Sequence, residues 1–361
     1  MKSKQNQPVS SQKRNSQKIF LSGNILTSLG ILLVTVGGSW DITNHLLNKP
    51  ETFFSPPHAL MYSGVAVSLI GVAVSLAGFR RMEDVKFYFR LPLRLAFLGI
   101  ALLVGAGPFD FVWHTNFGLD GLLSPAHLTL IAGMLFCSLG GMIGISRFLV
   151  LSTFQNKFSN YLIVFAMLPV WLAGSGLISS LSLPFSNTEF FKFNPEPLFG
   201  FVMATIAYPF LISLMCITSA KLSGFKPGII SLIGGLFLLI YGMTAIVPNF
   251  ALVESVEFYF LNIIPFAIVD IIVTSRKTRN SLLVAGGISG SIFYMVYYPY
   301  VMYTYNEFLL GKLVSPSMIY HVYFELMPQV LLITIIPSII LGIIGVLVSF
   351  KFSNKISIKF Q

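Results

Sequence analysis

Long apolar runs alternate with short polar segments along the whole chain, and this pattern sets the predicted fold. A membrane-spanning helix needs about 20 consecutive, mostly apolar residues. Such runs occur at 19–40, 57–79, 91–113, 125–147, 160–182, 198–220, 228–247, 257–275, 281–301 and 323–350. The segments between them are too short for a soluble domain, which takes about 50 residues or more. The sequence therefore predicts an all-α, polytopic transmembrane helical bundle of about ten spans, joined as hairpins with outward-facing loops.

The composition excludes a protein that works in water. Of the 361 residues, 55% are hydrophobic and 10% are charged. An ordinary soluble domain carries about 25% charged residues. Soluble enzymes, disordered scaffolds and free nucleic-acid binders are therefore ruled out.

The positive charge is distributed according to topology. All but three of the 23 Lys and Arg residues fall in the tails, in the even-numbered loops or at the helix ends beside them; the exceptions are Lys49, Lys192 and Lys312. Cytoplasmic loops carry the excess of Lys and Arg in membrane proteins. We therefore expect both termini in the cytoplasm of a cell-membrane protein, with the lipid bilayer as partner and no nucleic acid. The first apolar run is too long for the apolar region of a signal peptide, so we interpret it as a span.

Two segments 69 residues apart share a polar pattern. In each copy an aromatic residue precedes an Asp, a His follows four residues later, an acidic residue follows after six more, and a Ser-Pro-x-His sequence closes the motif. The matched ligand-type residues are Asp41, His45 and His58 in the first copy and Asp110, His114 and His127 in the second. The chain has only five histidines, and four of them lie in these copies. We interpret the first two hairpins as an internal repeat.

The spacing predicts two clusters of metal ligands. Asp and His four residues apart share one face of a helix, here at the outer end of a span. Ser-Pro-x-His is typical of a helix start, with Ser as cap and Pro in the first turn. A short outer loop then brings the Asp and both His residues together near the extracytoplasmic face. Two imidazoles and a carboxylate suit iron, copper or zinc and leave coordination positions open. Glu51 and Asp120 are candidates for orienting an imidazole.

The second copy resembles a metal motif of the copper membrane monooxygenases, the particulate enzymes that oxidise methane or ammonia, in which one of three membrane subunits carries it. The family pattern is an Asp three residues before a Trp-His pair, an Asp six residues after that His, and then Ser or Thr, Pro, any residue and His. The second copy matches every position, including Trp113 and Asp120, whereas the first has Asn44 and Glu51 at the corresponding places. The resemblance implies copper, oxygen-dependent oxidation of a small substrate, and other membrane subunits or a redox partner. It covers about eighteen residues of each copy.

The rest of the chain carries weaker candidates. His321 and Glu325 are four residues apart near the start of the last span, and we include them as a secondary metal candidate. We interpret the tyrosines of 294–305 as an aromatic belt at the membrane interface. The expected organisation is a basic tail (1–18), a four-helix region with both motifs (19–147), a six-helix region (148–350) and a second tail (351–361).

Three functions remain open at this level. The first is a copper-dependent monooxygenase component. The second is copper acquisition, delivery or storage without catalysis. The third is a zinc-dependent intramembrane hydrolase that activates water. The sequence also leaves open whether the two clusters form one dinuclear site or two mononuclear sites.

Overall fold

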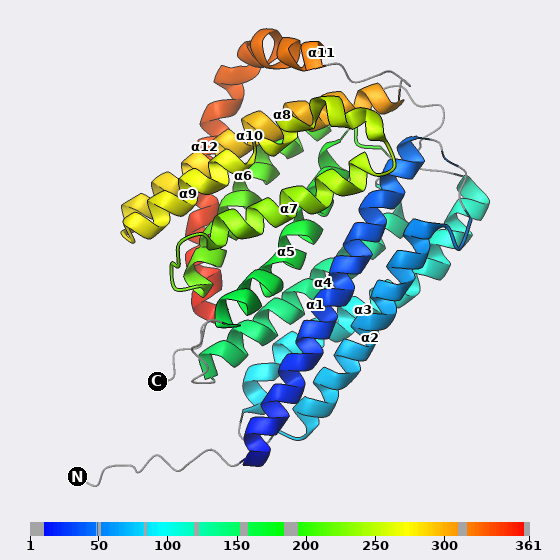
Figure 1. Ribbon diagram of the computed structural model, residues 1–361, viewed down its shortest axis with the longest axis vertical. Coiled ribbons are helices and arrows are strands. Elements are labelled where there is room, and N and C mark those ends of the chain that lie inside the picture. Colours follow the sequence, from blue (N-terminus) through cyan, green and yellow to red (C-terminus); the bar gives the residue numbers. More distant parts are fainter. Residues whose placement is uncertain are drawn as a thin grey trace.

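A computed structural model describes residues 11–47, 49, 52–82, 85–118, 123–151, 158–183, 194–309 and 316–356. Every regular element in these residues is a helix, so the all-α prediction is confirmed (Figure 1). The elements are α1 (Ser11–Leu46), α2 (Pro56–Arg80), α3 (Lys86–Phe117), α4 (Pro125–Leu151), α5 (Phe158–Ser182), α6 (Pro197–Leu222), α7 (Ile229–Ile246), η1 (Phe250–Ser255), α8 (Val256–Phe260), α9 (Ile263–Ser275), α10 (Arg279–Leu309), α11 (Pro316–His321), η2 (Val322–Leu326) and α12 (Met327–Ile356).

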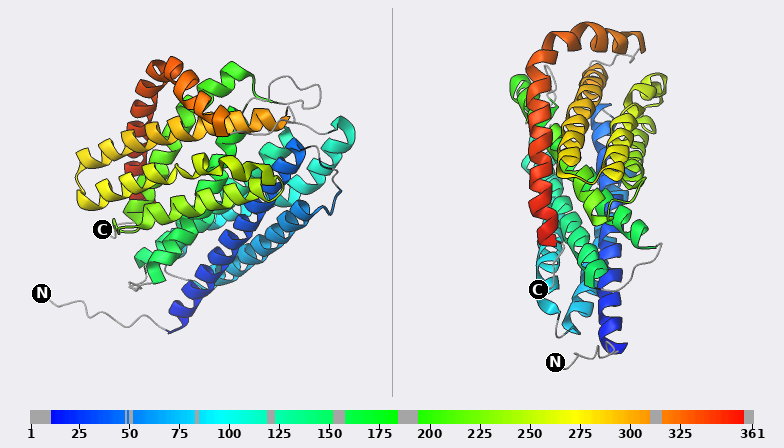
Figure 2. Two further views of the ribbon diagram at one scale, coloured as in Figure 1. Left: turned by 45° about the horizontal axis from the view of Figure 1, so that its top comes forward. Right: turned by 90° about the vertical axis from the view of Figure 1, so that its left-hand side faces the viewer.

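Ten helical segments in the described residues are long and apolar enough to cross a membrane, as the sequence predicts. Two of them are less regular than the hydropathy pattern indicates. The eighth consists of η1, α8 and α9 in succession. The tenth starts with α11, which lies across one end of the bundle and turns through the π-helical η2 into α12 (Figures 1 and 2). Hydropathy records only the apolar length of a segment, so it does not detect such changes of direction.

The first four helices form two hairpins, α1–α2 and α3–α4, which lie side by side in Figure 1. Small residues let the helices of each hairpin approach closely. A methyl group at Gly64 would lie 2.6 Å from the carbonyl oxygen of Gly30, and one at Gly99 would lie 2.8 Å from that of Gly133. The close contact fixes the register of α2 relative to α1, and that of α4 relative to α3. It thereby sets which side chains meet at the hairpin ends.

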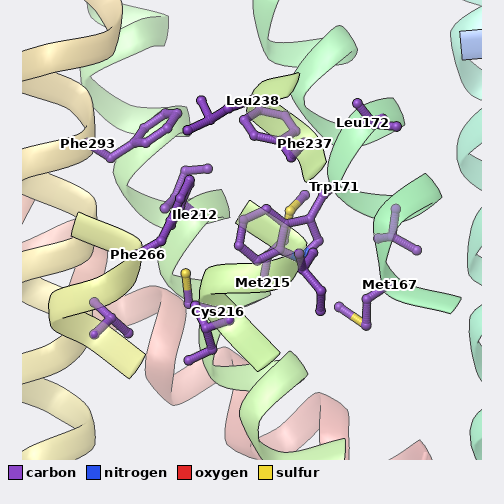
Figure 3. Packing of buried hydrophobic residues seen from close by; sticks show 14 of the residues in the cluster. Met167, Trp171, Leu172, Ile212, Met215, Cys216, Phe237, Leu238, Phe266 and Phe293 are labelled. Atoms are coloured by element: carbon purple, nitrogen blue, oxygen red, sulfur yellow. The ribbon is translucent and has the colours of Figure 1, made fainter. Parts of the chain in front are cut away.

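The remaining helices pack around an aromatic core. Trp171 of α5 is fully buried and contacts the rings of Phe237 and Phe266 at centroid distances of 5.9 and 5.2 Å (Figure 3). Cys216 of α6 and Phe293 of α10 complete this cluster. Buried residues of α4 (Met142, Ile143 and Ile145) belong to the same cluster, so this core joins the second hairpin to the six-helix region.

The interpretation of the tyrosines as an interfacial belt is wrong for four of them. Tyr294, Tyr297, Tyr298 and Tyr300 are buried inside the bundle. Burial is tolerated because their hydroxyl groups find internal partners. The hydroxyl of Tyr294 lies 2.9 Å from that of Thr205, Tyr298 donates to the carbonyl oxygen of Ser182, and the Tyr300 hydroxyl lies 3.2 Å from that of Ser255. The side chain of Tyr305 lies outside the described residues.

Asp270 of α9 is a buried carboxylate with a structural role. It accepts hydrogen bonds from the backbone amides of Gly228 and Ser231 at 3.2 and 2.9 Å, and from the Ser231 hydroxyl at 2.9 Å. Gly228 is the N-cap residue of α7 and Ser231 lies in its first turn, where the N–H groups have no partner within the helix. Asp270 therefore caps α7 from a neighbouring helix.

The Asp270→Ala variant is expected to be less stable by about 1–3 kcal/mol, because it removes three partly buried hydrogen bonds to a carboxylate at the start of α7. Its unfolding midpoint in a denaturant titration of the detergent-solubilised protein measures the effect. Thr274→Ala, one turn along the same helix, is the matched control, because Thr274 donates only to carbonyls of its own helix. Equal stability of Asp270→Ala and the control would show that the cap contributes nothing.

Candidate metal centre

Each hairpin places one Asp and two His residues at its connected end. Asp41 and His45 lie in the last turns of α1, and His58 lies in the first turn of α2. In the second hairpin, Asp110 and His114 lie near the end of α3, and His127 lies in the first turn of α4. Within each set, one donor atom from every residue lies within 4.8 Å of the others. We call Asp41, His45 and His58 the first triad and Asp110, His114 and His127 the second triad.

The first triad is compact and largely buried. The Nε2 atom of His58 lies 2.9 Å from Asp41 Oδ1, and the Nε2 atom of His45 lies 3.7 Å from Asp41 Oδ2. Asp41 and His45 are 6% and 4% exposed. Ligands bound at about 2.0–2.2 Å to one ion are about 3–4 Å apart, so these separations suit a shared ion.

The second triad has the same arrangement with a more open carboxylate. The Nε2 atoms of His114 and His127 lie 3.4 and 3.7 Å from Asp110 Oδ1. The side chain of Asp110 is 30% exposed, whereas that of His127 is 9% exposed. Both imidazoles therefore direct Nε2 at the same carboxylate oxygen, as in a metal site with two His ligands and one Asp.

Backbone carbonyl groups orient one imidazole in each triad. The Nδ1 atom of His58 lies 2.9 Å from the carbonyl oxygen of Thr52, and that of His114 lies 2.9 Å from the carbonyl oxygen of Gly118. A carbonyl oxygen only accepts, so Nδ1 is the donor and carries the proton. In a neutral ring, Nε2 then presents its lone pair toward the carboxylate. This is the common arrangement of metal-bound histidine, whose second nitrogen donates to an outer partner.

The carboxylate oxygens at the centre of the triads fit a cation. Asp41 Oδ1 and Asp110 Oδ1 are buried, and among the described residues the Nε2 atoms of His58 and His114 lie 2.9 and 3.4 Å from them. A buried carboxylate is costly unless it is paired with charge or coordinates a metal. A metal ion between the carboxylate and the Nε2 lone pairs would satisfy both kinds of donor. The other species that suits these distances is an imidazolium paired with the carboxylate, and metal analysis separates the two.

The two triads adjoin. The ring of His45 in the first triad lies against both histidines of the second, with centroid distances of 5.7 Å to His114 and 6.0 Å to His127. The His114 and His127 rings are themselves 5.7 Å apart. The six residues therefore form one cluster at the junction of the two hairpins. The sequence alone does not show whether the two triads lie together or apart.

A cavity of about 250 Å³, the outer cavity, lies between the hairpins and reaches both triads. Asp41, His58, Asp110 and His127 line it. The rest of its wall is mostly apolar and includes Met61, Val65, Leu103, Val104, Ala126 and Leu130. Two of the residues that line it, Val104 and Phe53, are 50% and 44% exposed, so the cavity lies close to the surface of the chain. A small apolar molecule in this cavity would touch ligands of both triads.

The aromatic ring of Phe53 stands at the rim of the outer cavity. It contacts the ring of Tyr62 on α2 at 5.1 Å and that of Phe111 on α3 at 5.7 Å. Phe53 thus bridges the two hairpins beside the triads. The sequence pattern does not reveal this residue, because nothing in the order of polar residues distinguishes it from the many other Phe residues.

The motifs also contain three candidate supporting residues, Glu51, Asp120 and Trp113. Glu51 and Asp120 lie outside the described residues. Trp113 packs against Phe109 and Phe117 of its own helix, at centroid distances of 6.0 and 4.4 Å.

His321 Nδ1 lies 2.7 Å from Glu325 Oε2, and both side chains are well exposed, at 44% and 65%. No third His, Cys, Asp or Glu ligand joins this pair among the described residues. It is therefore an exposed ion pair on α11 and η2, far less complete than either triad.

The predicted helix starts differ in how they are capped. Ser124 accepts a hydrogen bond from the His127 amide at 3.2 Å and so caps α4 as the motif predicts. Ser55 precedes α2, but its side chain makes no capping hydrogen bond, and that part of the prediction is wrong. Pro56 begins α2 without an amide to satisfy. The first hairpin therefore places His58 by means of proline and the carbonyl of Thr52.

Comparisons with known proteins add no relative. No protein-family model matches the chain, and neither a curated protein nor a solved structure matches it. The class that fold and site define is a multi-pass membrane-helical protein with two His/Asp groups suited to metal.

Proposed function

We propose that this chain is a membrane metalloprotein that binds a pair of copper ions and takes part in the oxygen-dependent oxidation of a small substrate. The observation that carries the proposal is the pair of adjoining Asp-His-His triads beside an apolar cavity. Intramembrane ionisable residues are rare and usually functional, and here six of them gather in one place.

The donor set supports a transition metal. Two imidazoles and one carboxylate per ion suit copper, iron and zinc, whereas magnesium and calcium prefer oxygen ligands alone. The resemblance to the copper membrane monooxygenases selects copper among them. Copper, when bound, would supply redox chemistry with dioxygen. Iron and zinc are the alternatives that elemental analysis resolves.

The residues of the chain contribute binding, orientation and exclusion of water. The carboxylates of Asp41 and Asp110 supply negative charge, and the carbonyls of Thr52 and Gly118 hold two imidazoles in place. The apolar wall of the outer cavity keeps the centre dry and accepts a small, weakly polar substrate from the bilayer. Of the three functions that the sequence leaves open, oxidation is therefore placed before copper handling and zinc-dependent hydrolysis.

The charge distribution supports an orientation with both termini in the cytoplasm. The connected ends of the first two hairpins, with both triads, would then lie near the extracytoplasmic face. By the resemblance to the copper membrane monooxygenases, a redox partner or other membrane subunits would supply the electrons.

Elemental analysis of the protein, purified from copper-replete cells, tests the identity of the metal. We expect copper in the wild type and in His321→Ala, which removes an exposed histidine outside both triads. Zinc alone would favour an intramembrane hydrolase in which metal-bound water attacks a lipid ester or amide. Copper that is bound without oxygen consumption in the presence of an electron donor would favour storage or delivery.

A further inference from the structure

A second cavity lies on the other side of the metal centre. It has a volume of about 150 Å³ and lies between α1 and α4 on one side and α5, α7, α8 and α10 on the other. Asp41, His127 and Leu130 line both this inner chamber and the outer cavity. These three side chains therefore form the wall between the two spaces. The six-helix region supplies most of the remaining lining.

The inner chamber is rich in hydroxyl groups, yet most of them are turned to partners in the protein. Tyr241 donates to the carbonyl oxygen of Leu172 at 2.6 Å, and Ser180 donates to that of Leu177 at 2.7 Å. The other lining hydroxyls with a known partner are those of Thr35, Ser39, Thr43, Ser179, Tyr300 and Thr304. Five of these eight hydroxyls donate to backbone carbonyls, and those of Ser39, Ser179 and Tyr300 pair with other hydroxyls. These bonds leave the chamber few donors for a ligand.

The remaining lining offers no charge beyond the metal centre itself. Among the described residues that line it, Asp41 and His127 are the only ionisable ones apart from the tyrosines, and Leu130, Ile131, Met134, Leu172 and Leu252 form an apolar wall. A charged ligand would lose its hydration there without compensation. An apolar cavity of about 150 Å³ can stay dry and bind benzene or xenon. The chamber thus matches a neutral, apolar molecule of that size.

From this lining we infer that the inner chamber is a second binding site, which takes a small neutral apolar molecule of at most about the size of benzene. The six-helix region would thereby provide a place where a small molecule can pass or be held. This place lies next to Asp41 and His127, on the side opposite the outer cavity. Its role toward the metal rests on the proposed function, whereas its occupancy does not require the metal.

Two glycines allow the two cavities to be filled separately, and a third provides a control. Gly38 lines only the inner chamber, and a methyl group there would lie 3.6 Å from Met61 Sδ, an ordinary contact. Gly107 lines only the outer cavity, where a methyl group would lie 3.7 Å from Tyr62 Cε1. A methyl group at Gly105 would meet nothing within 4 Å, and Gly105 lines neither cavity. Leucine at each position gives two filling variants and a matched control.

Crystals of the full chain under xenon pressure test the inference through the anomalous signal of xenon. We expect xenon in the inner chamber of the wild type and of Gly105→Leu, with or without metal. Gly38→Leu should lose it there and keep it in the outer cavity, and Gly107→Leu should show the reverse. Ala245→Leu is a second filling variant should Gly38→Leu fail to fold, because Ala245 lines only the inner chamber.

Ordered water in place of xenon in the wild-type chamber would overturn the inference, as would xenon that persists there in both Gly38→Leu and Ala245→Leu. Neither result depends on whether the triads bind metal. A protein that binds xenon in the chamber but no copper would overturn the proposed function and leave this site standing.

Discussion

Replacement of His45 by Ala is expected to weaken metal binding in both triads. His45 is a ligand of the first triad, so its loss should lower the affinity there by at least about 100-fold, more than the loss of a supporting residue around a metal ligand does. Its ring also packs against His114 and His127. Without it, these rings lose a neighbour that restricts their orientation, and the affinity of the second triad should fall by about tenfold. Titration of metal-free protein with Cu(II), followed by the ligand-field absorption, measures both constants.

His58→Ala is the matched control for this coupling. His58 is also a ligand of the first triad, but its described ring contact is with Tyr62 and its Nδ1 atom meets the carbonyl of Thr52. It should therefore abolish tight binding in the first triad and leave the second nearly unchanged. Equal effects of His45→Ala and His58→Ala on the second triad would contradict the coupling that we infer from the ring contacts.

Asp41→Asn is expected to remove the ion of the first triad while the fold persists. Asparagine keeps the shape of the side chain but lacks the negative charge, and Asp41 lies 2.9 Å from the Nε2 atom of His58. We expect a loss of affinity of about 100-fold or more. The unfolding midpoint of the metal-free variant should equal or exceed that of the metal-free wild type, because a buried carboxylate without a cation is costly.

Asp270→Asn provides the opposite pattern. Asp270 is a second buried acidic residue, and its carboxylate caps α7 instead of facing a histidine. This variant should lower the unfolding midpoint and retain both metal ions. A loss of metal in Asp270→Asn equal to that in Asp41→Asn would show that metal content reports general damage and not ligation.

The fold could be predicted from the sequence because the bilayer imposes a simple rule on span length. Ten apolar runs predict ten spanning segments, and the structure contains them. The breaks between η1, α8 and α9, and the turn at η2, depend on local backbone packing that hydropathy does not record. The tyrosines show a second limit. An apolar stretch with many Tyr residues is typical of an interfacial belt, yet Tyr294 and Tyr298 are buried because Thr205 and the Ser182 carbonyl meet their hydroxyls.

The composition of each triad could also be predicted, because helix periodicity places Asp41 beside His45 and a short loop returns His58 to them. The contact between the triads could not. It depends on how the hairpins pack against each other, which brings His45 to His114 although they are far apart in the sequence. The two cavities follow from the same packing, since one lies between the hairpins and the other between the hairpins and the six-helix region.

The number of metal ions bound per chain tests the central claim most directly. Elemental analysis of copper-loaded protein should give one ion for each of the two triads. The Asp41→Asn/His58→Ala and Asp110→Asn/His127→Ala variants should each retain a single ion, and electron paramagnetic resonance should show coupled copper only in the wild type. Wild-type protein that binds no transition metal, or copper that is unchanged in both variants, would contradict the account.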